Sequence, residues 1–252
     1  MKRRTSAGAS ARRQYHLRRR AWRRRALRRW LYGLPLALPA AAVLAWWTGW
    51  HTLHTPAFGA AAGAAALGAF TLGTLRTPQH VTAWRQGAQG ERSVARVLER
   101  TARRRGGVVL ADRLEPGSRS ANIDFFFTTA AGSWVVDAKN WQARGARVEL
   151  GPDGTLWYGN RPQHKTLRGV KRQARQAASA ISRVLGEHVE VTPILAICGA
   201  PVGRRGVLAV DGVLIVELRR LPSVLRSRLG NKLTVAETDR VAEAARRVLL
   251  PA

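Results

Sequence analysis

The chain has 252 residues, enough for one sizeable domain and additional segments. Its formal net charge is +28, and no Asp or Glu precedes Glu91, so the amino-terminal third is purely basic. Cys198 is the single cysteine, which excludes an internal disulfide framework and a zinc site built from cysteines. Because nearly all basic residues are arginine, the few lysines are more informative about function.

The first 29 residues are dense in arginine pairs and triplets. Because like charges this close repel one another, we expect segment 1–29 to be a disordered arm in isolation. We favour the interpretation that it holds the orientation of a following membrane span. A compatible alternative is that it binds anionic lipid headgroups or nucleic acid.

An uncharged stretch follows, from Trp30 to Leu75. As one helix it would reach about 69 Å, roughly twice the hydrocarbon thickness of a bilayer. The polar segment 51–56, H-T-L-H-T-P, divides it. The sequence therefore predicts a transmembrane hairpin over 30–76, with helices at about 31–50 and 57–75. A cleaved signal peptide is disfavoured because the apolar run is too long and a second one follows.

The hairpin has further features of a membrane segment. Trp46, Trp47 and Trp50 are placed where an interfacial aromatic belt would lie. Gly59 and Gly63 form a small-xxx-small pattern typical of closely packed helices. Arginines flank both spans, so we expect an inner cell membrane location with both termini and the following domain in the cytoplasm.

Beyond the hairpin the sequence predicts an α/β domain over residues 83–252. We expect a helix at 87–100, a strand at 108–112, two strands within 121–141, a hairpin turning at 152–154, a helix at 164–185, strands at 191–198 and 212–216, and a closing helix at 234–250. Val235, Val241, Ala245 and Val248 should face inward on the closing helix. Helices on both sides of the strands in the sequence predict three layers around a mixed sheet.

The two strands within 121–141 carry the most informative polar residues. Asp124 lies in I-D-F-F-F, and Asp137 lies in W-V-V-D-A-K. Lys139 follows two residues after Asp137, so the period of a strand places both side chains on one face. Charges in such apolar surroundings need a metal, a partner or a substrate.

The order of several motifs resembles the nuclease-related domain, NERD, a family of the restriction-endonuclease-like PD-(D/E)xK superfamily. These motifs are G-A-Q-G-E, N-I-D-F, V-V-D-A-K-N-W, L-W-Y-G-N-R-P and a later helix with Gln173, together spanning about residues 83–200. Ile123 stands where the superfamily has a proline. The resemblance implies a restriction-endonuclease-like fold and metal-dependent nuclease activity.

The same resemblance implies a role for individual residues. Asp124 and Asp137 correspond to metal ligands, Lys139 to the catalytic lysine, and Glu91 to a helix-borne acid that completes the metal site. Gln173 corresponds to a helical glutamine of the catalytic set. Trp141 follows the lysine in the position of an aromatic packing residue.

The chemistry agrees with these roles. Phosphodiester hydrolysis needs an activated water and neutralisation of charge on the phosphate. Carboxylate oxygens suit Mg²⁺ or Mn²⁺, and a neighbouring lysine can orient the water or hold the phosphate. The alternative for the D-x-K triplet is a structural Asp–Lys pair at the end of a strand.

We therefore expect a membrane-anchored, Mg²⁺-dependent nuclease acting on DNA. A catalytically silent nucleic-acid-binding or adaptor domain on the same fold is the main alternative, because the charge supports binding in either case. A membrane scaffold that recruits proteins is a third.

Overall fold

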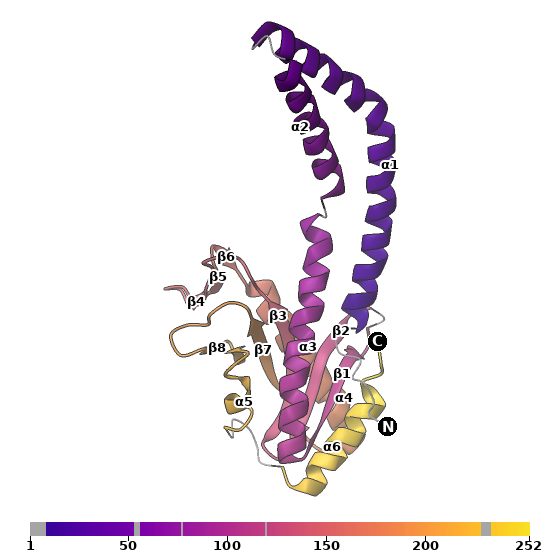
Figure 1. Cartoon of the computed structure of the whole chain (residues 1–252). Coiled ribbons are helices and arrows are strands. Elements are labelled where there is room, and N and C mark those ends of the chain that lie inside the picture. Colours follow the sequence, from indigo (N-terminus) through magenta and orange to yellow (C-terminus); the bar gives the residue numbers. More distant parts are fainter. Residues whose placement is uncertain (1–8, 53–55, 77, 119, 228–232) are drawn as a thin grey trace. The chain divides into compact units, whose positions relative to one another are not determined.

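A computed structural model describes the chain except for residues 1–8, 53–55, 77, 119 and 228–232 (Figure 1). The chain divides into two compact units, one spanning Arg13–Trp84 and one containing Arg85–Ala252. Each unit is described by itself.

The first unit is helical. Helix α1 (Ala9–Trp47) is followed by a π-helical turn (Thr48–Thr52) and by helix α2 (Pro56–Leu75). From Ala9 onward the arginine-rich arm is helical and continuous with the apolar part of α1, whereas the expectation of disorder concerned the arm in isolation. Arginine, alanine and leucine are all good helix formers, and the arm continues directly into the apolar part of α1, so it needs no separate nucleation.

Two segments of this unit, Tyr15–Trp50 and Ala57–Leu75, are long and apolar enough to cross a membrane by length and composition. They contain the two apolar helices expected near 31–50 and 57–75. Their large apolar side chains are mostly exposed, for example Leu36 (76 %) and Leu72 (74 %), which is unlike the core helix of a soluble protein. Part of the polar segment between them, residues 53–55, lies outside the described residues.

Helices α1 and α2 pack closely at the two glycines of the small-xxx-small pattern. A β-carbon at Gly59 would lie 2.1 Å from the carbonyl oxygen of Ala45. One at Gly63 would lie 3.0 Å from the β-carbon of Ala45 and 3.1 Å from the carbonyl oxygen of Ala41. Only glycine allows such an approach of the two backbones, so the predicted packing ridge is confirmed.

The second unit is an α/β domain. Its helices are α3 (Gln79–Arg105), of which the part from Arg85 belongs to this unit, α4 (His164–Leu185), α5 (Leu221–Val224) and α6 (Val235–Val248). Its strands are β1 (Gly107–Leu114), β2 (Asn122–Thr129), β3 (Gly132–Asn140), β4 (Val148–Leu150), β5 (Leu156–Tyr158), β6 (Arg161–Pro162), β7 (Thr192–Cys198), β8 (Val207–Val210) and β9 (Val213–Glu217).

Six strands form the central sheet in the order β1-β2-β3-β7-β9-β8. Strands β1, β2 and β3 are antiparallel neighbours, whereas β3, β7 and β9 run parallel. The edge strand β8 is antiparallel to β9. The sheet is therefore mixed, as predicted, and β4, β5 and β6 form a separate small sheet.

A hydrophobic core lies on each face of the central sheet. Val135 and Leu195 pack with residues of α4 and α6 on one face. Val136 and Ala196 pack with residues of α3 and α5 on the other. Successive side chains of the buried strands point to opposite faces of the sheet and so pack into both cores. This produces the expected three-layer α/β arrangement.

The structure also differs from the expectations in detail. Strand β8 and helix α5 were not predicted, because four-residue elements contain too little periodicity. Val235 was expected to face inward but is 76 % exposed. It is the first residue of α6, directly after the Thr234 cap, so it lies outside the buried stripe that contains Val241 and Ala245.

Candidate active site

Strands β2 and β3 part in the middle of the sheet, and the two strand aspartates lie where they separate. Pairing between these strands ends at Phe125 and Val136. Strand β2 stays paired with β1 as far as Asn122, and β3 stays paired with β7 as far as Asn140. The two strands therefore separate inside the sheet, and the first unpaired residue beyond the last pair is Asp124 on β2 and Asp137 on β3.

The backbone of β3 binds Asp124 across this opening. The N–H of Ala138 lies beyond the last β2–β3 pair and donates to Asp124 Oδ2 at 2.9 Å. On β3 itself, Lys139 Nζ lies 2.7 Å from Asp137 Oδ1. The Asp137 side chain is 12 % exposed and that of Lys139 is 36 % exposed, so the lysine is the more accessible partner.

The charges of this group perturb one another. Burial raises the pKa of Asp124 well above its ordinary value, and the charges of Asp137 and Glu91 raise it further. Lys139 and the Ala138 N–H act in the opposite direction. Burial lowers the pKa of Lys139, but the nearby charges of Asp137 and Asp124 outweigh it, so the net shift is upward. A carboxylate repelled by its neighbours is stabilised by any added positive charge.

Glu91 lies on α3 and acts on Asp124 through its charge. Among the described residues, no group of three or more His, Cys, Asp or Glu side chains is arranged to hold a metal ion. Helix α3 packs on the face of β3 that carries Val136 and Ala138, whereas alternation directs Asp137 to the opposite face.

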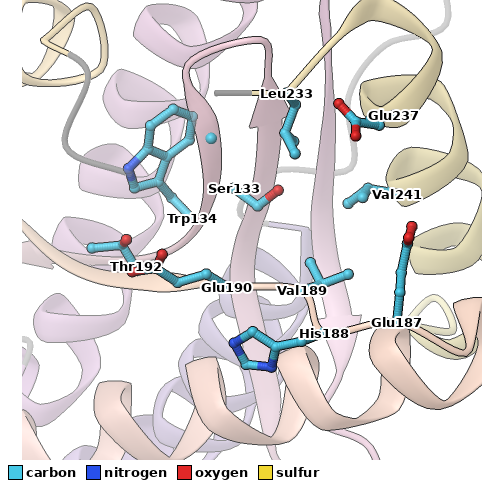
Figure 2. Close-up of a pocket in the computed structure, with 11 residues that line it drawn as sticks. Ser133, Trp134, Glu187, His188, Val189, Glu190, Thr192, Leu233, Glu237 and Val241 are labelled. Atoms are coloured by element: carbon cyan, nitrogen blue, oxygen red, sulfur yellow. The ribbon is translucent and has the colours of Figure 1, made fainter. Parts of the chain in front are cut away.

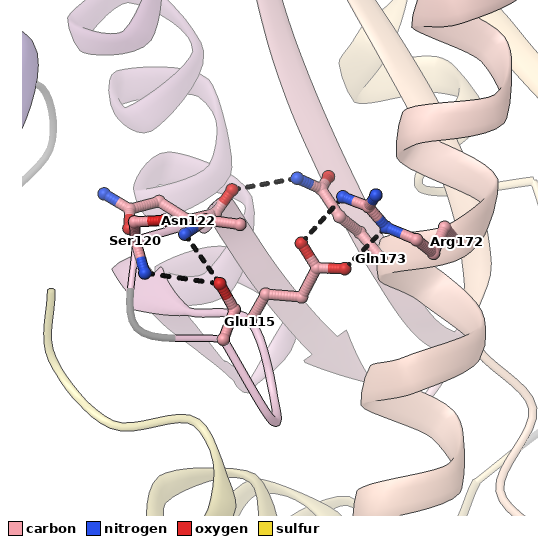
Figure 3. Close-up of polar contacts among 7 residues, drawn as sticks. Glu115, Ser120, Asn122, Arg172 and Gln173 are labelled. Carbon is pink, nitrogen blue, oxygen red and sulfur yellow. Dashed lines mark hydrogen bonds and ion pairs between the residues drawn. The ribbon is translucent and has the colours of Figure 1, made fainter.

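Gln173 on α4 reaches the strand that carries Asp124. Its Nε2 donates to the backbone oxygen of Asn122 at 2.8 Å, two residues before Asp124 (Figure 3). Its Oε1 is buried and has no hydrogen-bond partner among the described residues. No described contact joins Gln173 to the aspartates or to Lys139. Its observed contact is with the backbone at the start of β2.

The neighbouring residue on α4 makes a contact that the sequence did not indicate. Arg172 binds Glu115 through two hydrogen bonds of 2.8 and 3.0 Å (Figure 3). Glu115 is only 2 % exposed and follows β1, whereas Arg172 is 57 positions farther along the chain. Adjacent residues of α4 thus hold both ends of the β1–β2 connection. No local pattern indicates a partner at such a separation.

The start of β2 has a second support. Asn122 Nδ2 donates to Asp112 Oδ1 at 3.2 Å. Asp112 is 6 % exposed and has a φ of 53°, a left-handed conformation that is uncommon for a residue other than glycine. Strained backbone of this kind persists only where the surrounding structure holds it, and here it lies between the β1–β2 pairs Ala111–Phe125 and Arg113–Ile123.

Trp141 behaves as the predicted packing residue. Its ring stacks on Tyr158 with centroids 4.6 Å apart and planes 15° apart, and it packs against the core. The Tyr158 hydroxyl accepts a hydrogen bond from the Ala143 N–H at 2.6 Å. These contacts attach the small β4–β6 sheet to the end of β3, next to Lys139.

A cavity of about 190 Å³ lies at the other end of the strands (Figure 2). Its wall includes Ser133 and Trp134 at the start of β3 and Thr192 at the start of β7. Glu187 and Glu237 also line it, but they already bind Arg240 and the Thr234 backbone. This cavity is separate from the aspartates.

The donor atoms present suit a hard divalent cation. Asp124 and Asp137 offer carboxylate oxygens, the preferred ligands of Mg²⁺ and Mn²⁺. Burial, and then the repulsion from Asp137 and Glu91, raise the pKa of Asp124, and a bound cation would oppose both effects. Mg²⁺ commonly uses only one or two protein carboxylates and retains several waters, so two aspartates fit this chemistry.

A mixed sheet between two helical layers, with acids where two antiparallel strands part, is the architecture of the restriction-endonuclease-like class. Residues 86–198 match the family model of the nuclease-related domain, NERD, so this chain contains a nuclease-related domain. The match includes all five predicted site residues, Glu91, Asp124, Asp137, Lys139 and Gln173. No curated protein and no solved structure matches the chain.

Proposed function

We propose that the protein is a membrane-anchored, divalent-metal-dependent nuclease that hydrolyses phosphodiester bonds of DNA. The observation that carries this proposal is the gathering of Asp124, Asp137 and Lys139 where β2 and β3 part. The nuclease-related domain at residues 86–198 supports the reaction class.

Asp124 and Asp137 would hold Mg²⁺ or Mn²⁺, with Lys139 beside them as the catalytic lysine. The bound cation would supply charge neutralisation at the phosphate and a more acidic water. Lys139, kept protonated by the carboxylates around it, would hold a phosphate oxygen or orient the attacking water. Glu91 on α3 would be the third acid of the metal site, and Gln173 would act by fixing the start of β2.

The charge of the chain favours a polyanionic partner. A net charge of +28 attracts phosphates without regard to sequence, so we expect binding to DNA with steep salt dependence. The buried carboxylates argue for catalysis rather than binding alone, because a binding surface gains nothing from negative charge near a phosphate.

The two apolar helices favour anchoring in the inner cell membrane. Their exposed Leu and Trp side chains would contact lipid, and the arginines before and after them would keep both termini and the α/β domain in the cytoplasm. The arginine-rich arm would then face the anionic headgroups of the same leaflet.

Incubation of the full-length chain in detergent with plasmid and linear DNA, with Mg²⁺, Mn²⁺ or EDTA, tests the proposal. We expect cleavage with either metal, none with EDTA, and none with the Asp137→Asn variant. Equal cleavage by Asp137→Asn would remove these residues from the mechanism.

A catalytically silent nucleic-acid-binding domain is the second candidate. It is favoured by the Asp137–Lys139 ion pair, which a purely structural role would also explain. DNA binding without metal-dependent cleavage of any DNA or RNA substrate would support this candidate.

A further inference from the structure

A second cavity in the α/β domain, of about 250 Å³, lies between the end of α3 and α5. It is separate from the aspartates and is lined by Val97, Arg100, Thr101, Arg104, Arg105, Pro222 and Arg226. Three of its arginines come from the last turns of α3, and the fourth follows α5. We refer to it as the four-arginine pocket.

Among the described residues, no acidic side chain lines this pocket. Within the described ranges, none of its arginines forms an ion pair, whereas Arg172, Arg240 and Arg246 elsewhere in the domain each bind a glutamate. Four guanidinium groups around one cavity repel one another, so an anion in the cavity would stabilise the arrangement.

The carboxyl-terminal end of α3 explains only part of this pattern. Basic residues in the last turn of a helix interact favourably with its dipole, which accounts for Arg104 and Arg105. It does not account for Arg226, which belongs to another element. It also does not account for the cavity itself, whose lining includes Val97 and Pro222.

We propose that the four-arginine pocket binds a backbone phosphate of nucleic acid, at a second contact point away from the aspartates. One planar guanidinium group can bind two oxygens of a phosphate at once, and several guanidinium groups can bind the same phosphate. The cavity is smaller than typical pockets for whole small molecules, which favours a phosphate group over a complete nucleotide.

The position of the pocket suits an extended polyanion. Along α3, Arg104 lies about 20 Å from Glu91 at 1.5 Å per residue. This separation corresponds to about six base pairs of a duplex at 3.4 Å each. A duplex lying along α3 would therefore extend from the pocket to the helical turn that carries Glu91. The proposal rests on the nucleic-acid binding in the proposed function and is independent of cleavage.

A pair of matched double variants tests the pocket. Arg100→Ala with Arg226→Ala removes two pocket arginines, one from each element. Arg96→Ala with Arg103→Ala removes the same charge from exposed positions of α3 that do not line the pocket. Thermal melting of the full-length chain in detergent verifies that both variants fold, and pocket arginines can be replaced singly if the double variant does not.

The measurement is the anisotropy of a labelled 30-base-pair duplex in EDTA, at several salt concentrations. We expect the pocket variant to bind about tenfold more weakly and the slope of log K against log salt to fall by about one. The control should change affinity less than about twofold. Inorganic pyrophosphate should compete more weakly against the pocket variant than against the wild type.

Equal losses in the two double variants would overturn the proposal, because net charge alone would then explain binding. Unchanged DNA binding in the pocket variant would overturn it as well. If the pocket variant loses binding to phosphatidylglycerol vesicles but keeps its binding to DNA, the pocket binds lipid headgroups and the proposal is also overturned. Cleavage assays with Mg²⁺ distinguish this proposal from the proposed nuclease function. If the pocket variant binds DNA more weakly but neither it nor the wild type cleaves DNA with metal, the nuclease function is refuted and the phosphate-binding pocket is supported.

Discussion

Asp124 Oδ2 accepts a hydrogen bond from the backbone N–H of Ala138 at 2.9 Å, across the point at which β2 and β3 stop pairing. This bond ties the carboxylate of one strand to the backbone of the next, directly beside Asp137. The two aspartates are therefore positioned by central strands of the sheet and not by loops. Such support provides the precision that a catalytic group needs.

The first prediction concerns the aspartates and the lysine. Asp137→Asn retains the size of the side chain but removes the charge that a metal needs, so cleavage should fall by at least about a hundredfold while the fold persists. Lys139→Ala should reduce cleavage similarly yet leave Mn²⁺ binding intact, because an ammonium is not a ligand. Lys139→Arg should restore little of the cleavage activity, because a planar guanidinium group replaces a compact ammonium group. Initial rates and Mn²⁺ titration provide the measurements.

Lys171→Ala is the matched control for these variants. Lys171 also forms an ion pair with an aspartate, Asp211, but at the surface. We expect its cleavage rate to stay within about twofold of the wild type, because exposed ion pairs contribute little. A comparable loss there would show that the lysines act through general charge.

The second prediction separates positioning from catalysis at Gln173. Gln173→Met preserves length and loses the hydrogen bond to the Asn122 carbonyl. We expect cleavage to fall about tenfold, with unchanged metal binding, because only the start of β2 is affected. Gln173→Glu cannot donate when ionised and should behave similarly. A loss as large as that of Asp137→Asn would assign Gln173 a direct catalytic role.

The third prediction concerns the buried carboxylate of Glu115. Arg172→Ala would leave this group without its charged partner in an environment that is 2 % exposed. We expect a loss of about 2 kcal/mol in the free energy of unfolding, seen as a lower melting temperature. Arg175→Ala removes the same charge from an exposed position on the same helix and should change it by less than about 0.5 kcal/mol.

The fourth prediction concerns the packing of α1 on α2. Gly59→Ala would place a β-carbon against the Ala45 carbonyl oxygen and force the helices apart, so the melting temperature in detergent should fall. At Gly68 on the same helix, an added β-carbon would meet no heavy atom within 4 Å. Gly68→Ala should therefore stabilise α2 slightly, by about 0.5–1 kcal/mol, as the better helix former. If Gly59→Ala and Gly68→Ala changed the melting temperature in the same direction, the close packing of α1 on α2 at Gly59 would be contradicted.

The fifth prediction concerns topology. A cysteine at Thr52 should react with a membrane-impermeant thiol reagent in intact cells, whereas one at the exposed Ser179 of α4 should react only after lysis. The native Cys198 should add little background at pH 8, because it is buried and burial raises the pKa of its thiol to about 11. Labelling of Ser179→Cys but not of Thr52→Cys in intact cells would reverse the proposed orientation.

Much of the architecture follows from local patterns in the sequence. The absence of charge from Trp30 to Leu75 indicates the apolar helices, and alternation around Asp124 and Asp137 indicates paired strands. Helix α4 begins and ends within the expected range, 164–185. Periodicity and charge are properties of neighbouring residues, so they can be interpreted without tertiary structure.

The tertiary structure alone determines which of these residues meet. It places α3 against the Val136 face of β3, where the charge of Glu91 adds to the effects of burial and of Asp137 on the pKa of Asp124. It joins Arg172 to Glu115 and Gln173 to Asn122, contacts 57 and 51 positions apart in the chain. It also gathers Arg226 with the arginines of α3 around one cavity. Contacts between distant elements depend on how whole layers pack, and local propensity carries no information about that packing.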